Sequence, residues 1–127
     1  MISSNIEDYL ETIYLFIKKN DRPIRTTELA QLLNINPSAI TSMAKKLHSK
    51  GYILYEPYIG IRLTEKGKEV AKKIIRKHKI IESFLRDYLK LDEKKASEEA
   101  CKIEHVISDE TIAKLYDYMN ESKKSKI

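Results

Sequence analysis

Six side chains in this sequence are candidate ligands for a transition-metal ion, and several of them recur at helical spacing. Asp8 and Glu11 are three residues apart, so they share one face of a helix. A second group begins at Cys101, with a carboxylate three residues later and an imidazole four residues later. Carboxylate, imidazole and thiolate donors together suit Fe²⁺, Mn²⁺, Co²⁺, Ni²⁺ or Zn²⁺ rather than Mg²⁺ or Ca²⁺. The candidate metal ligands are Asp8, Glu11, His78, Cys101, Glu104 and His105.

Each candidate ligand also has a purely structural explanation, because helical spacing is easily matched by chance. Asp8 and Glu11, near the start of a helix, interact favourably with the helix dipole. A lone cysteine such as Cys101 often behaves as a small buried hydrophobe. Glu82, four residues after His78, is a further candidate ligand, but it is also placed to pair with a basic neighbour on the helix surface. Spacing alone therefore leaves the metal site a hypothesis.

The composition is that of a globular protein of one ordinary domain, or of a small domain with an extension. The 127 residues are 42% hydrophobic and 34% charged, with three glycines, three prolines and one cysteine. These numbers exclude a disulfide scaffold, a cysteine-rich zinc finger and a glycine-rich phosphate loop. No apolar run approaches the length of a membrane span, and the N-terminus lacks the pattern of a signal peptide. The lone cysteine indicates a reducing compartment, so we expect a cytoplasmic protein without membrane contact.

Charge is distributed unevenly along the chain. Residues 22–90 carry fifteen lysines and arginines against six acidic residues, a net charge of +9. Residues 1–21 and 91–127 each carry a net charge of −2. A basic middle attracts polyanions such as DNA, and two acidic ends that fold together suit a cation. A lysine-rich solvated surface is the simpler alternative at this stage.

Apolar periodicity, caps and turn residues predict three helices and a hairpin in the first half of the chain. The helices are expected over residues 4–19, 26–33 and 37–49. Asn36 is a good N-cap, and Pro37 suits the first helical position because its missing N–H is not needed there. Residues 52–63 are rich in Tyr, Ile and Leu, with Pro57 and Gly60 at the turn, which predicts a β-hairpin. Two helices joined by a tight turn and followed by a hairpin are typical of a winged helix-turn-helix.

The second half of the chain is expected to be entirely helical. Thr64 can cap a long helix that runs to about Lys90. Asp92 starts a further helical stretch, and Ser108 caps a last helix that reaches about Tyr118. The predicted fold class is therefore mainly α, with an N-terminal winged helix-turn-helix followed by an all-helical domain.

The third helix presents small polar residues opposite its apolar stripe, which is the pattern of a helix that reads DNA. A helix enters the major groove, and small side chains favour contact with thymine methyl groups and readout of DNA shape. The candidate base-reading residues are Pro37, Ser38, Ala39, Thr41 and Ser42. Arg25, Lys45 and Arg62 are expected to contact phosphates. Double-stranded DNA is therefore the expected partner.

Five segments of the sequence together match a known family. They read EDYLETIY at residues 7–14, NPSAIT at 36–41, LTEKG at 63–67, RKH at 76–78 and EEACKIEHVISDE at 98–110. The last block is the most specific of them. On these residues the chain resembles the diphtheria toxin repressor family of metal-dependent transcriptional regulators, which includes the iron-dependent regulators and the manganese transport regulators. The resemblance extends over about residues 3–120.

The resemblance implies both an architecture and a function. It implies a homodimer, with a winged helix-turn-helix DNA-binding domain over residues 1–64 and a helical dimerisation and metal-binding domain over residues 65–127. It implies a short form without the SH3-like domain of the iron-type members. A divalent metal ion would act as corepressor, and the metal-loaded dimer would bind operators in front of metal-uptake genes. It implies no enzymatic activity.

The resemblance also implies a mixed ligand set. Five of the candidates, namely Asp8, Glu11, His78, Glu104 and His105, match ligand positions of the manganese-type members. Cys101 matches the thiolate ligand of the iron-type members, where the manganese type has a glutamate. Of the second iron-type site, His78 and Glu82 remain, but Ser97 replaces a histidine. We therefore expect one or two ions per chain, with Fe²⁺ favoured and Mn²⁺ next, because a thiolate is a softer donor than a carboxylate.

Three alternatives to a metal-dependent repressor remain open from the residues alone. The first is a winged-helix transcription regulator that responds to a small non-metal ligand. The second is an enzyme in which a metal ion activates water, although no nucleophile–base motif supports it. The third is a winged-helix module for protein interaction, which the basic middle segment argues against. Binding assays with and without a chelator separate the first alternative from the metal-dependent reading.

Overall fold

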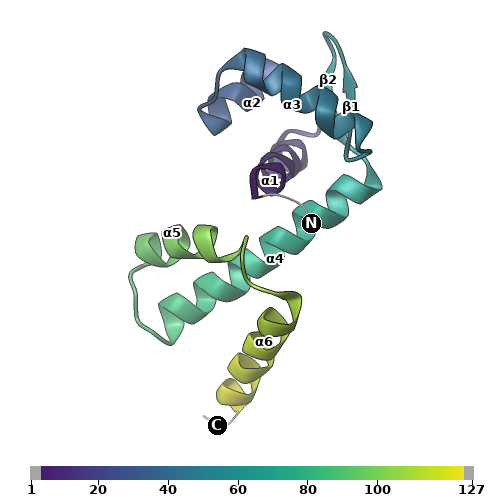
Figure 1. The fold of residues 1–127 in the computed structure, drawn as a ribbon. Helices are drawn as coiled ribbons and strands as arrows, with labels where there is room; N and C mark the ends of the chain where they lie inside the picture. The colour runs from purple at the N-terminus through teal and green to yellow at the C-terminus, as the bar shows by residue number, and fades with distance from the viewer. Residues whose placement is uncertain (1–3, 125–127) are drawn as a thin grey trace. The chain divides into compact units, whose positions relative to one another are not determined.

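The computed structural model describes residues 4–124, and within them the side chains of residues 5–122. Six helices and two strands follow one another along these residues (Figure 1). They are α1 (Ser4–Asn20), α2 (Thr26–Leu33), α3 (Pro37–Ser49), β1 (Ile53–Glu56), β2 (Gly60–Leu63), α4 (Glu65–Asp87), α5 (Glu93–Ile103) and α6 (Asp109–Lys124). The chain divides into two compact units, Met1–Lys73 and Ile74–Ile127, with the division falling inside α4. The predicted fold class is confirmed, with a winged helix-turn-helix followed by a helical part.

Local capping explains why α2 and α3 form separate helices. Asn34 adopts the left-handed conformation that ends α2, with a φ of 54°. The side chain of Asn36 then accepts a hydrogen bond from the backbone N–H of Ser38, 2.9 Å away, and Pro37 occupies the first turn of α3. The tight turn of the helix-turn-helix therefore follows from Asn34, Asn36 and Pro37, and the sequence predicts the last two as the start of α3.

The wing is a two-stranded antiparallel hairpin. Ile53 pairs with Leu63 and Glu56 with Gly60, so Pro57, Tyr58 and Ile59 form the tip. The hairpin is tied to the chain before α2, because Ile24 and Ile61 exchange backbone hydrogen bonds of 3.1 and 2.8 Å. That tie fixes the wing beside the start of α2, where a DNA-facing surface is expected.

The first unit has a single apolar core beneath its helices and hairpin. Fully buried side chains from α1, α3 and the hairpin meet there, among them Ile13, Ile40 and Ile53. Gly67, at the start of α4, packs so closely against the backbone of Tyr52 that a Cβ at this position would collide with the Tyr52 carbonyl. The glycine of the LTEKG segment is therefore required by packing rather than by backbone flexibility.

The second unit joins the C-terminal part of α4 to α5 and α6. Asp92 caps α5 by accepting a 2.7 Å hydrogen bond from the backbone of Lys95. The core includes Ile81, Ala100 and Ile112. The last helix continues to Lys124 and not only to Tyr118, because no breaker follows Tyr118 and Met119 extends the buried stripe. No helix in the described part of the chain is both long and apolar enough to cross a membrane.

Candidate metal centre and DNA-facing surface

Three of the predicted metal ligands come together in the second unit. The Nδ1 atom of His78 lies 2.9 Å from Oε1 of Glu104 and 3.8 Å from Sγ of Cys101. The candidate donor atoms of these three residues all lie within 4.8 Å of one another. One imidazole nitrogen, one carboxylate oxygen and one thiolate sulfur converge, which is a donor set that fits a borderline transition-metal ion.

Two chain segments far apart in the sequence supply these donors. His78 lies midway along α4, whereas Cys101 belongs to the last turn of α5. The helix ends at Ile103, and Glu104 caps it with helical backbone angles. The helical spacing of Cys101, Glu104 and His105 predicts that all three share one turn of a helix. This prediction is wrong for His105, which lies in the turn after the helix. The reason is local, since the backbone N–H groups of Val106 and Ile107 both bond the carbonyl of Ile103 and close that turn.

Glu104 is the one buried charged side chain among the described residues, with 1% of its surface exposed. Burial of a carboxylate is costly unless it is paired or coordinates a cation. In this structure its Oε1 meets the imidazole of His78. A buried carboxylate beside an imidazole and a thiol is difficult to explain as a surface ion pair, and it favours the metal-site interpretation over the structural explanations.

Glu82 contacts the other side of the same imidazole. Its Oε2 lies 2.9 Å from Nε2 of His78, and its Oε1 accepts a 3.4 Å hydrogen bond from Arg86. Burial is the largest single influence on His78 and favours the neutral ring, but Glu104 and Glu82 together outweigh it and raise the pKa of His78. Since both nitrogens face carboxylates, the imidazole donates on both sides when it is protonated.

Asp8 and Glu11 lie on α1, in the first unit, where Asp8 is exposed and Glu11 is half-buried. His105 is half-buried in the turn between α5 and α6. The convergence of donor atoms found among the described residues involves His78, Cys101 and Glu104. The contribution of Asp8, Glu11 and His105 to a metal site therefore stays a prediction.

The predicted DNA-reading residues lie on the solvent side of α3. Pro37, Ser38, Ala39, Ser42 and Lys45 are exposed, and Thr41 is half-buried. Two hydroxyl groups have partners near the helix start. That of Ser38 donates to the Asn36 side chain at 2.8 Å, and that of Thr41 to the Pro37 carbonyl at 3.3 Å. A hydroxyl that donates within the helix still offers its lone pairs, so these two residues can accept hydrogen bonds from bases.

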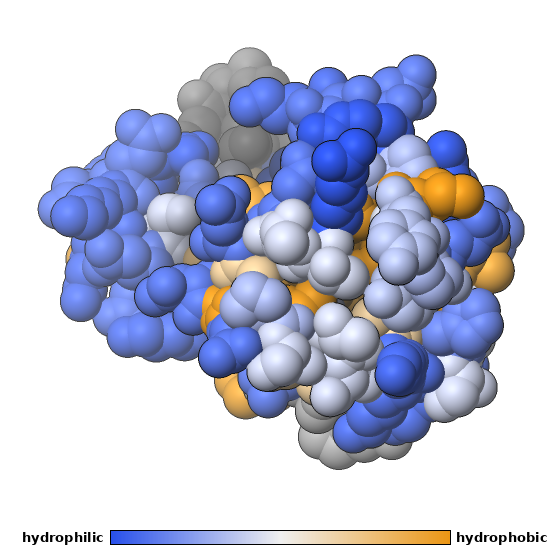
Figure 2. Space-filling view, turned by 90° about the horizontal axis from the view of Figure 1, so that it is seen from above, coloured by the Kyte–Doolittle hydropathy of each residue, from blue (hydrophilic) through white to orange (hydrophobic). Residues whose placement is uncertain are grey.

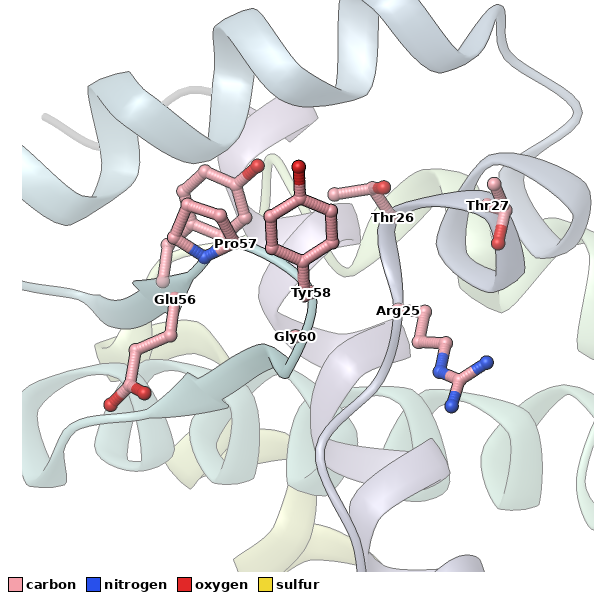
Figure 3. A pocket seen from close by; sticks show the side chains of 8 residues that line it. Arg25, Thr26, Thr27, Glu56, Pro57, Tyr58 and Gly60 are labelled. Carbon is pink, nitrogen blue, oxygen red and sulfur yellow. The ribbon is translucent and has the colours of Figure 1, made fainter.

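A surface hollow of about 550 Å³ lies between the start of α2 and the tip of the wing (Figure 3). Arg25, Thr26 and Thr27 line one side of it, and the wing residues from Tyr55 to Tyr58, with Gly60, line the other. In Figure 3 the Tyr58 ring stands between Pro57 and Thr26, while the guanidinium of Arg25 extends away from it. The predicted phosphate contact Arg25 thus borders a concave, solvent-open surface.

Tyr58 was not singled out by sequence reasoning. Its side chain is fully exposed and its φ is 69°, an uncommon backbone conformation for a residue with a bulky side chain. Ile59 beside it is 57% exposed. The sequence did contain a signal for an exposed ring at the tip of the wing, because Tyr58 lies between Pro57 and Gly60 in the predicted hairpin turn. The predicted phosphate contact Arg62 is also exposed, on β2.

The space-filling view from above shows mostly hydrophilic side chains, with apolar ones only in separate patches (Figure 2). A surface of this kind favours a polar, charged partner over an apolar docking partner.

Family models match nearly the whole chain. The model of the iron dependent repressor N-terminal DNA binding domain matches residues 1–61, and that of the iron dependent repressor metal binding and dimerisation domain matches residues 64–126. An HTH-type transcriptional regulator of Methanocaldococcus jannaschii is 66% identical over 96% of this chain and 98% of that protein. The HTH-type transcriptional regulator MntR of Bacillus subtilis is 36% identical over 92% of this chain and 81% of that protein.

Solved structures agree with these matches. The manganese regulator SloR has a TM-score of 0.78 and is 33% identical over 91% of this chain, which spans only 53% of the SloR chain. A hypothetical protein from Sulfolobus solfataricus has a TM-score of 0.75 at 26% identity and is covered over 91% of its length. The chain thus spans about half of one solved relative and nearly all of another.

The DNA-binding domain, the metal-binding and dimerisation domain and the converging donor atoms define a metal-dependent transcriptional repressor with a divalent metal cofactor. The chain belongs to the diphtheria toxin repressor family of metal-dependent regulators. Members of this family are DNA-binding transcriptional regulators and not enzymes, which confirms that expectation.

Proposed function

We propose that this protein is a homodimeric repressor of metal-uptake genes and that Fe²⁺ is its corepressor, with Mn²⁺ as the next candidate. The observation that carries the proposal is the convergence of His78, Cys101 and Glu104 on one point of the second unit. A thiolate in this donor set favours Fe²⁺ over Mn²⁺. The solved relative SloR is a manganese regulator, which supports keeping Mn²⁺ as the alternative.

We assign the ligands as Nδ1 of His78, Sγ of Cys101 and a carboxylate oxygen of Glu104, completed by Asp8, Glu11 and His105. A bound ion would supply positive charge that balances the negative charges of these carboxylates and of the Cys101 thiolate. Asp8 and Glu11 come from the DNA-binding domain, proposed over residues 1–64, and the other ligands from the domain proposed over residues 65–127. We expect that, without a cation, repulsion among these carboxylates would leave the separation of the DNA-reading helices free to vary.

The dimer then acts through spacing. Two α3 helices must enter successive major grooves, with half-sites one or more DNA turns apart. Ligands that tie α1 to the dimerisation domain would restrict that spacing, and a shift of a few kcal/mol between restricted and unrestricted states suffices for a switch. Pro37, Ser38, Ala39, Thr41 and Ser42 would contact base edges, and Arg25, Lys45 and Arg62 would contact phosphates.

The test combines metal titration with DNA binding. Chelator-stripped protein is titrated anaerobically with Fe²⁺ and with Mn²⁺, and operator binding is measured with each ion and with chelator. We expect one or two ions per chain and DNA binding that requires the ion. Binding that persists unchanged in chelator would instead support the winged-helix regulator of a non-metal ligand, and an absence of saturable metal binding would refute the proposal.

Two variants test the ligand assignment. Glu11→Ala and His105→Ala should abolish metal-dependent DNA binding while thermal unfolding shows a folded protein. Glu69→Ala, at an exposed position of α4, serves as the matched control and should behave as wild type. If His105→Ala still bound its operator only with metal, the assignment of His105 would be wrong.

A further inference from the structure

One lysine of the second unit differs from the others in its surroundings. The side chain of Lys77 is only 12% exposed, and Lys77 and Lys68 are the two lysines that are not exposed among those whose side chains the structure describes. For Lys68 the corresponding value is 44%. An ammonium group withdrawn from water is costly unless its hydrogen-bonding capacity is used. Lys77 therefore calls for a structural explanation that surface solvation does not provide.

The ammonium of Lys77 contacts two residues, Ile107 and Asp109, that lie about thirty positions further along the chain. It donates a 2.8 Å hydrogen bond to the carbonyl oxygen of Ile107 and forms a 3.1 Å ion pair with Asp109. Ile107 closes the turn that contains Glu104 and His105, and Asp109 is the first residue of α6. One side chain of α4 thus holds both the end of this turn and the start of the last helix.

Lys77 directly precedes His78, and successive residues of a helix point about 100° apart. The turn is therefore held by α4 from two directions. His78 contacts its beginning, at Glu104, whereas Lys77 contacts its end, at Ile107. Because only two residues separate Glu104 from Ile107, fixing Ile107 restricts where the Glu104 carboxylate can lie.

We propose that Lys77 is a positioning residue, which fixes the turn from Glu104 to Ser108 against α4 and so holds the Glu104 carboxylate at His78 before any ion binds. The inference rests on the proposed metal site, whose donors must be held within a fraction of an ångström to bind an ion well. Residues that orient metal ligands typically change metal affinity ten- to a hundred-fold when they are removed. Lys77 acts through backbone and not by contact with the ion.

The test uses the full chain and two independent measurements. Lys77→Met removes the charge and keeps the length of the stem, Lys77→Arg keeps a donor, and Lys79→Met is the control at an exposed position two residues on. Amide hydrogen exchange in metal-free protein reports directly on residues 104–107. We expect exchange there to be at least tenfold faster in Lys77→Met than in wild type, close to wild type in Lys77→Arg, and unchanged in Lys79→Met.

Titration with Co²⁺ alone, followed by thiolate-to-cobalt absorption from Cys101, gives the second measurement. We expect a ten- to hundred-fold weaker affinity in Lys77→Met, with the absorption spectrum of the saturated protein preserved and affinity restored in Lys77→Arg. If Lys77→Met does not fold, Asp109→Asn removes the ion pair, keeps the bond to Ile107 and should show a smaller effect of the same sign. Unchanged exchange at residues 104–107 overturns the inference. Failure of wild-type protein to bind Co²⁺ overturns the proposed function instead, and leaves the exchange result to decide the role of Lys77.

Discussion

The Nδ1 atom of His78 lies 2.9 Å from Oε1 of Glu104, a residue 26 positions later in the chain. The same nitrogen faces the thiol of Cys101, while Nε2 on the opposite side of the ring is occupied by Glu82. The two nitrogens of this imidazole therefore have different surroundings. Nδ1 lies beside the Glu104 carboxylate and the Cys101 sulfur, whereas Nε2 faces Glu82.

This difference in surroundings predicts that Glu82 orients His78 and does not bind the ion itself. Glu82→Ala should weaken Co²⁺ affinity about ten- to a hundred-fold, which is typical for the loss of a carboxylate behind a ligating histidine. The number of ions bound at saturation should not change. Isothermal titration gives both quantities. Loss of an ion from the stoichiometry would show that Glu82 is a ligand, as considered from the sequence.

The thiolate of Cys101 should set metal preference. Cys101→Ser replaces a soft donor by a hard, weak one, so affinity for Fe²⁺ should fall more than affinity for Mn²⁺. Anaerobic competition titrations of wild type and variant measure the ratio of the two affinities. Ser97→Ala, one turn earlier on α5, is the control and should leave that ratio unchanged. An equal loss of affinity for both ions would show that sulfur does not determine the preference.

Tyr58 at the tip of the wing should contribute an apolar contact to DNA. Tyr58→Ser removes an exposed ring. If the ring contributes on the order of 1 kcal/mol to binding, operator affinity should fall by less than about tenfold. The salt dependence of binding should stay the same, because no charge is removed. Fluorescence anisotropy at several salt concentrations measures both. Leu54→Ser, 51% exposed on β1, is the control, and an affinity of Tyr58→Ser equal to wild type would exclude the contact.

The two glycines that flank the wing should respond differently to alanine. Gly51 has a φ of 82° and open space where a Cβ would lie, so Gly51→Ala should cost about 1 kcal/mol through backbone strain. Gly67→Ala places a methyl group against the Tyr52 carbonyl and should cost more, about 2 kcal/mol or above. Thermal and urea unfolding of both variants gives the comparison. Equal stability of the two variants would mean that α4 moves away from Tyr52 at no greater cost than the backbone strain at Gly51.

Acid should weaken the first unit through Glu28. The pKa of Glu28 is lowered from 4.5 to about 2. The main cause is a bidentate hydrogen bond from Arg22, and the backbone N–H of Arg25 adds to it. The ionised form is thus favoured in the folded state, and its contribution is complete above about pH 4.5 and lost as the pH falls towards 2. Because the pair is partly exposed, Glu28→Gln should lower the free energy of unfolding by at most about 1 kcal/mol at pH 6.

The measurement for Glu28 is urea unfolding at pH 6 and at pH 3. The difference between wild type and Glu28→Gln should shrink at the lower pH. Glu65→Gln removes a more exposed pair with Lys68 and should have a smaller effect at both values. A difference that grows at pH 3 would contradict the stated direction of the pKa shift.

The sequence by itself determined the elements and the family of this protein. Asn36 and Asp92 cap their helices as predicted, and the wing turns at residues 57–59, because caps, turns and apolar periodicity act over a few neighbouring residues. The expected limits failed only where a local signal was weak, as at Tyr118, after which α6 simply continues. The donor types were also evident, since softness and hardness are properties of single side chains.

Only the tertiary structure decided which of those donors meet and what holds them. His78 reaches Cys101 and Glu104 across 23 and 26 residues, and that approach depends on how α4 and α5 pack. The contacts of Lys77 with Ile107 and Asp109 were equally out of reach, because on a lysine-rich helix no local pattern distinguishes Lys77, whose side chain is only 12% exposed, from the exposed Lys79. Side-chain burial is set by the neighbours that folding brings close, and the sequence around a residue does not contain them.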